Sequence, residues 1–72
     1  MVRSSIAARA ALEKGCDLYD QGKAGEAFKA FYHSAKLGNP QAQVNLANLY
    51  DTGEGVERNH EQATYWYKMA MR

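Results

Sequence analysis

Cysteine is nearly absent from this 72-residue chain, in which Cys16 stands alone. A single cysteine cannot form an intramolecular disulfide, and small secreted domains ordinarily depend on several. Charged residues, among them Arg9, Glu13 and Lys14, interrupt the apolar start of the chain, so we do not expect it to act as a signal peptide. The predicted location is therefore a reducing compartment, the cytoplasm.

An excess of charge of one sign is also missing. The chain has 9 basic and 8 acidic residues, for a formal net charge of +1, and no stretch concentrates either sign. This balance favours neither nucleic-acid binding nor a polybasic membrane anchor. No apolar run approaches the roughly 18 residues that a membrane span requires. We expect the chain to bind neither nucleic acid nor membrane.

The sets of residues that catalysis or metal binding would need are incomplete. His60 begins a motif similar to a zinc helix, but Thr64 stands where the second histidine is required. Gly53 and Gly55 lack the third glycine of a dinucleotide-binding loop, because Arg58 occupies its place. We predict no enzymatic activity, no cofactor and no metal site. A small hydrolase or ligand-binding protein is kept as an alternative from another class.

What the sequence does contain is an internal repeat. Four residues recur at an offset of 31 positions, and two more recur at an offset of 36; the pairs are Ala11/Ala42, Leu18/Leu49, Tyr19/Tyr50, Gly22/Gly53, Ala27/Ala63 and Phe31/Tyr67. A repeat of this length indicates a solenoid, whose units stack to bury a shared core and present a binding surface. We predict one domain over residues 1–72, with repeats at about 5–38 and 39–72.

Capping and stop signals predict two helices in the first unit. The first helix is expected to begin after Ser4 or Ser5 and to end at Gly22. The second is expected from residue 23 or 24 to Lys36, with Gly38 as its stop.

The second unit carries clearer signals. Asn39 can cap a helix with Pro40 in its first position, ending at Gly53. Asn59 and Gln62 have the spacing of a capping box for a fourth helix. No pattern typical of a strand is present, so the predicted fold class is all-α, with four helices in two helix–turn–helix repeats.

The second unit resembles a Sel1-like repeat. The resemblance is carried by the loop Gly53-Glu54-Gly55-Val56 and by the helix motif Ala63-x-x-Trp66-Tyr67. The first unit is more similar to a tetratricopeptide repeat, the sister family of the same shape. It departs from the Sel1-like pattern at Gly15, where the second unit has Leu46, and at Ala30, where the second unit has Trp66.

The resemblance implies a short right-handed α-solenoid that serves as an adaptor or scaffold in protein complexes. In these families the first helix of each pair lines a concave groove, which here implies a partner-binding set of Arg9, Leu12, Cys16, Tyr19, Asp20, Gln43, Ala47, Tyr50 and Asp51. Helix stability alone does not explain the repeated Tyr-Asp pair, because an acidic residue near a helix C-terminus does not stabilise the helix. The alternative is that the tyrosines pack in the core and the aspartates are only solvated.

The last predicted helix is rich in apolar residues that nothing downstream covers. Tyr65 and Met69 lie one turn apart on a face distinct from the stripe that contains Trp66. Exposed apolar patches usually mark association sites. We therefore predict self-association through this helix as a two-fold dimer. The alternative to partner binding is thus a self-assembling oligomerisation element with no separate ligand.

Overall fold

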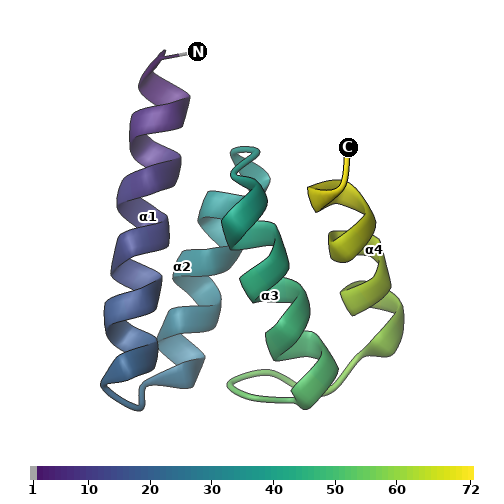
Figure 1. Cartoon of the computed structure of the whole chain (residues 1–72). Coiled ribbons are helices and arrows are strands. Elements are labelled where there is room, and N and C mark those ends of the chain that lie inside the picture. The colour runs from purple at the N-terminus through teal and green to yellow at the C-terminus, as the bar shows by residue number, and fades with distance from the viewer. Residues whose placement is uncertain (1) are drawn as a thin grey trace.

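The structure, a computed structural model, describes the backbone of residues 2–72 and the side chains of residues 4–72. It contains four helices and no strand in this part of the chain: α1 (Val2–Asp20), α2 (Ala24–Lys36), α3 (Pro40–Thr52) and α4 (His60–Ala70). Figure 1 shows the helices side by side in chain order, each antiparallel to the one before it, with α1 and α4 at the two ends. The predicted all-α class with four helices is confirmed, whereas the right-handed turn of the solenoid stays a prediction.

Helix α1 starts earlier than the sequence predicts. It begins at Val2, so Ser4 and Ser5 lie inside the helix and are exposed rather than capping it. Nothing before them breaks a helix, since neither proline nor glycine is present there. The predicted end is confirmed: Gly22 has φ +80°, its N–H donates to Tyr19 O at 2.9 Å, and Lys23 N donates to Leu18 O at 2.9 Å. This pair of bonds is a Schellman motif.

The two asparagine caps of the second unit form as predicted. Asn39 accepts a hydrogen bond from Ala42 N at 2.9 Å, and Asn59 accepts one from Gln62 N at 3.0 Å. The capping box at Asn59 is only half formed, because its backbone N–H donates to Tyr50 O at 2.9 Å. That bond ties the start of α4 to α3 in place of the reciprocal bond from Gln62.

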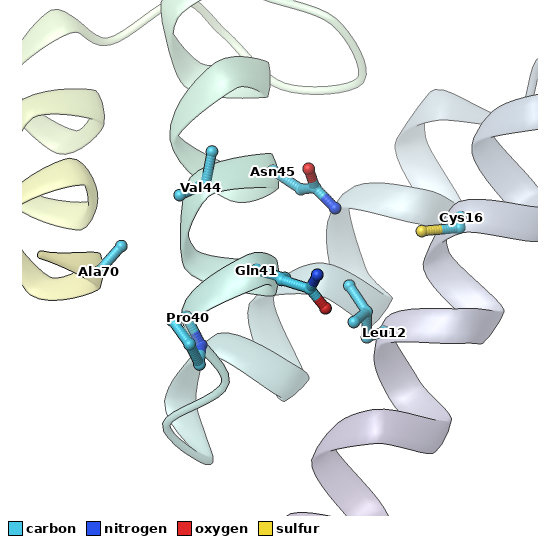
Figure 2. Close-up of a pocket in the computed structure, with 7 residues that line it drawn as sticks. All are labelled: Leu12, Cys16, Pro40, Gln41, Val44, Asn45 and Ala70. Atoms are coloured by element: carbon cyan, nitrogen blue, oxygen red, sulfur yellow. The ribbon is translucent and has the colours of Figure 1, made fainter.

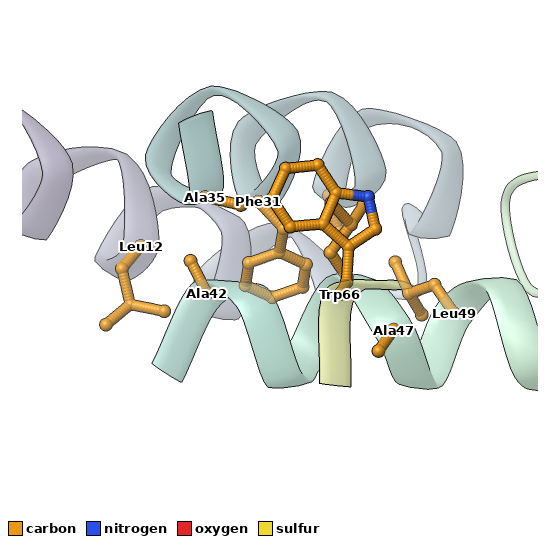
Figure 3. Close-up of a cluster of buried hydrophobic side chains, with 9 residues drawn as sticks. Leu12, Phe31, Ala35, Ala42, Ala47, Leu49 and Trp66 are labelled. Carbon is orange, nitrogen blue, oxygen red and sulfur yellow. The ribbon is translucent and has the colours of Figure 1, made fainter. Parts of the chain in front are cut away.

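A single buried cluster joins all four helices (Figure 3). Small residues let the helices approach closely, and large ones fill the spaces between them; the cluster consists of Leu12, Ala27, Phe31, Ala35, Ala42, Leu46, Ala47, Leu49 and Trp66. Buried polar bonds reinforce the packing. Ser34 Oγ donates to the carbonyl of Ala8, and Gln43 Nε2 donates to the carbonyl of Ala35 at 3.1 Å.

Gly15 stands where the second unit has the large residue Leu46, and its small size affects the packing of the first unit. A Cβ at this position would lie 2.6 Å from two ring carbons of Phe31. The buried ring of Phe31 therefore packs directly on the backbone of α1. The glycine on α1 thus makes room for the large ring on α2.

The loop at residues 53–59 runs back to the first unit (Figure 1). Gly55 has φ +70°, and a Cβ there would overlap the carbonyl oxygen of Ala24 at the start of α2. Val56 is half-buried and packs against the core. The loop thus connects the two units directly.

Candidate functional site

A groove runs between α1 and α3. Its first cavity, of about 420 Å³, has Leu12 and Cys16 on α1 and Gln41, Val44 and Asn45 on α3 among its lining residues. Figure 2 shows Gln41 and Asn45 directed across the gap toward the α1 side chains. A second cavity, of about 230 Å³, shares two of these residues, Cys16 and Asn45, so the two cavities form one surface, here called the α1–α3 groove.

The second cavity combines an apolar floor with acidic walls. Phe31 and Leu49 line it together with Asn48. Asp20 stands at the end of α1, and Glu54 comes from the loop after α3.

A hydrogen bond across the groove holds Glu54 in place. Tyr19 Oη donates to the Glu54 carboxylate, at 3.0 Å from one oxygen and 3.2 Å from the other. Thr52 Oγ1 also lies 3.2 Å from Oε1 of Glu54. The bond to Glu54, with its negative charge, raises the pKa of Tyr19. The phenol thus remains a donor that links the first unit to the loop of the second.

Cys16 is the thiol of the groove, and its surroundings disfavour the thiolate. Burial raises the pKa of the Cys16 thiol, and the nearby carboxylates of Asp20, Asp17 and Glu13 raise it further. A thiol must ionise to attack or to bind metal. In residues 4–72 no three His, Cys, Asp or Glu side chains gather in a way that could hold a metal ion.

Asn48 of α3 adds an amide group to the lining of the second cavity. Its Oδ1 accepts a hydrogen bond from the Tyr67 hydroxyl of α4. With the oxygen engaged, the amide NH₂ group is left as the donor for other partners.

The structure separates the residues that the family resemblance placed together. Leu12, Cys16, Tyr19 and Asp20 all line the groove. Arg9 lines neither cavity and forms an exposed ion pair with Glu13 at 3.7 Å.

The α3 members of the predicted set lie elsewhere. Ala47 is 0% exposed, within the core. Asp51 lies 3.8 Å from His60 and lines neither cavity. Gln43 and Tyr50 line a different cavity of about 630 Å³ between α2, α3 and α4, here called the aromatic recess. Of the predicted self-association pair, Tyr65 is exposed and Met69 is half-buried against the core; both border this recess.

The α3 residues of the groove were missed for a geometric reason. Translating one unit onto the next carries Leu12, Cys16 and Tyr19 onto Gln43, Ala47 and Tyr50. The groove, however, lies between faces of α1 and α3 that are not equivalent in the repeat. The α3 residues that line it are therefore not the equivalents of the α1 residues that line it. The signal for it was the spacing of polar residues at Gln41, Asn45 and Asn48, which puts them on one helix face.

Antiparallel helix pairs with a groove between the first helices of each pair define a helical-repeat protein. A family model described as Sel1 repeat matches residues 40–71, which span α3, the loop and α4. The second unit therefore matches the Sel1 repeat, and Sel1 repeats are non-catalytic units that mediate protein–protein interaction. The likeness of the first unit to a tetratricopeptide repeat stays a prediction.

The chain is also similar to a curated fungal protein. Over 45 residues it is 42% identical to "Chitin synthase regulator SKT5" of Saccharomyces cerevisiae (strain ATCC 204508 / S288c). The match covers 62% of this chain and 6% of that protein, so the chain spans only a small part of the relative. No solved structure matches the chain. None of the four described helices has both the length and the apolar character needed to cross a bilayer.

Proposed function

We propose that this chain is a protein-interaction module that binds an extended segment of a partner protein in the α1–α3 groove. Residues 1–72 act as one unit of two repeats, about 5–38 and 39–72. The partner places an apolar side chain on Phe31 and Leu49 and a lysine or arginine between Asp20 and Glu54. We place this binding in the cytoplasm, since a lone exposed cysteine suits a reducing compartment.

The main support for this proposal is the pair of carboxylates at the second cavity, those of Asp20 and Glu54. Among residues 4–72, the ion pairs join Arg9 to Glu13 and His60 to Asp51, so neither Asp20 nor Glu54 has a cation of this chain within 4.0 Å. A basic side chain from a partner supplies the missing charge, and such complementarity gives specificity and a faster association. The likeness to a regulator supports an adaptor role over a catalytic one.

A displayed library of random peptides tests the proposal. We expect selection on the wild-type chain to enrich an apolar residue close to a lysine or arginine. The double variant Asp20→Lys, Glu54→Lys should lose the selected peptide. The control Glu26→Lys, Glu57→Lys makes the same change in net charge at exposed positions outside the groove and should retain it. Equal binding by both double variants would refute the groove as the site.

Self-association is a second candidate function. It is favoured by the exposure of two apolar side chains at the C-terminal end, Tyr65 at 52% and Met71 at 83%. Light scattering at high micromolar concentration is the test. A dimer mass that Tyr65→Lys reduces to the monomer mass would support association through α4, and a monomer mass for the wild-type chain would exclude it.

A further inference from the structure

The aromatic recess is separate from the α1–α3 groove, because the two share no lining residue. Its walls include Tyr32 from α2, Tyr50 from α3 and Tyr65 from α4, with Trp66 between them. The Tyr65 and Tyr32 rings stand edge-on to the indole, at centroid distances of 5.0 and 6.2 Å. Clustered tyrosine and tryptophan side chains are typical of binding surfaces, because they combine apolar area with polar tips.

One residue of the recess, Trp66, has a buried hydrogen-bond donor that lacks an acceptor. Trp66 is 5% exposed, and its indole Nε1 has no hydrogen-bond partner. A buried donor left unpaired costs stability, and buried tryptophan N–H groups usually have a partner. Tyr32 and Tyr65 are exposed, and exposed side chains change rotamer within nanoseconds. Both rings contact the indole, so their movement changes what surrounds it.

The charge of the recess selects the kind of acceptor. Lys36 lines it, with Nζ 5.8 Å from the centroid of the Tyr32 ring. Among residues 4–72 no carboxylate lies within 4.0 Å of this ammonium group, and no Asp or Glu lines the recess. The side-chain amides of Asn59 and Gln62 add further donors. A carboxylate is the complementary group.

We propose that the aromatic recess is a second binding site, which takes an acidic peptide segment. A carboxylate of the segment pairs with Lys36, an oxygen of the segment accepts the Trp66 N–H, and a neighbouring apolar side chain packs between Tyr32 and Tyr65. This site is independent of the groove, and its failure would leave the proposal for the groove unchanged. The module would then have two binding surfaces, the α1–α3 groove for a basic segment and the aromatic recess for an acidic one.

The probe is N-benzoylglycine, which carries an aromatic ring, an amide and a carboxylate, with its neutral carboxamide as the control compound. Trp66 is the only tryptophan, so the chain gives a single indole N–H signal in a ¹⁵N-correlated NMR spectrum. We expect the acid to move this signal downfield and the amide to have little effect. Lys36→Gln should weaken binding by about tenfold. The matched control Lys29→Gln, exposed on the same helix and outside the recess, should bind as the wild type does.

Trp66→Phe provides a second test, because it removes the N–H and keeps an aromatic ring. Binding is then followed at the backbone amides of Gly38 and Met69, which border the recess. Weaker binding by this folded variant supports the indole contact. Equal shifts with acid and amide, or no loss in Lys36→Gln, would overturn the proposal. So would an indole signal that moves on dilution of the protein alone and not with the acid, since that marks a self-association surface.

Discussion

At the scale of single residues, Gly15 shows how one missing side chain determines packing. An alanine inside a helix ordinarily stabilises it by about 1 kcal/mol relative to glycine. Here the added Cβ would lie 2.6 Å from the ring of Phe31, which is buried. Overpacking of this kind costs about 1–3 kcal/mol.

We therefore expect Gly15→Ala to lower the melting temperature in a circular dichroism experiment. The control is Gly25→Ala in α2, where the nearest atom to the new Cβ is Gly55 O at 4.0 Å. That variant should melt at or above the wild-type temperature. If Gly15→Ala were the more stable of the two, the contact between Phe31 and the α1 backbone would be refuted.

Tyr19 provides a prediction about pH at the same scale. Its folded-state pKa is raised, because the hydrogen bond to Glu54 and the charge of that carboxylate favour the neutral phenol. A group with a raised folded pKa contributes stability below its unfolded pKa, which is about 10 for tyrosine. This contribution is lost as the pH rises through the folded-state value.

NMR titration of ring-labelled tyrosines measures this shift. We expect the Tyr19 midpoint to lie above that of an unfolded peptide and to fall toward it in Glu54→Gln. Burial raises the pKa of Tyr50 instead, so its midpoint should not respond to the same substitution. An unchanged Tyr19 midpoint in Glu54→Gln would show that the hydrogen bond does not form.

At the scale of elements, the loop at residues 53–59 joins one repeat to the other. Gly55 is required there for two reasons, its left-handed backbone and its approach to the carbonyl of Ala24. Gly22 has a similar backbone with φ +80°, but no atom lies within 4 Å of a Cβ built on it. Substituting Gly22 therefore measures the cost of backbone strain alone, and substituting Gly55 measures the cost of strain together with that of packing.

We expect Gly22→Ala to cost about 1–2 kcal/mol, from the left-handed conformation alone. Gly55→Ala should cost about 2–4 kcal/mol, because overlap with α2 adds to the strain. Urea unfolding of both variants measures the difference. Equal costs would mean that the loop does not pack on the first unit.

At the scale of the whole molecule, the two repeats share one hydrophobic core rather than having one each. Trp66 belongs to a cluster that includes Leu12 of α1, Phe31 of α2 and Leu46 of α3. A chain of 72 residues has about 4–11 kcal/mol of stability in total. The two repeats should therefore unfold together in one transition.

Trp66→Ala tests this unity, because truncation of a buried tryptophan costs about 3–5 kcal/mol. We expect the variant to lose most of its helical signal at 37 °C, or to melt in a single transition far below the wild type. Survival of about half the helix signal with an intact first unit would show that the repeats fold separately. An unchanged melting curve would contradict the burial of Trp66.

The sequence by itself determined the local structure. The caps at Asn39 and Asn59 and the stop at Gly22 depend on bonds between residues close in the chain, so the pattern of residues was enough to place them. The match of residues 40–71 to the Sel1 repeat was predictable for the same reason, since the loop and the helix of the second unit agree in type and spacing. The start of α1 was misplaced because a serine that can cap a helix is equally able to lie inside one.

Only the tertiary structure decided which faces of the helices meet. A repeat shows which residues of the two units are equivalent, but the groove lies between faces of α1 and α3 that are not equivalent. Asn48 and Glu54 therefore line the second cavity, whereas Ala47 lies in the core. The bond from Tyr19 to Glu54 and the recess around Trp66 join residues far apart in the chain. Such contacts depend on how the helices pack against one another, and the spacing of residues along a single helix does not contain that information.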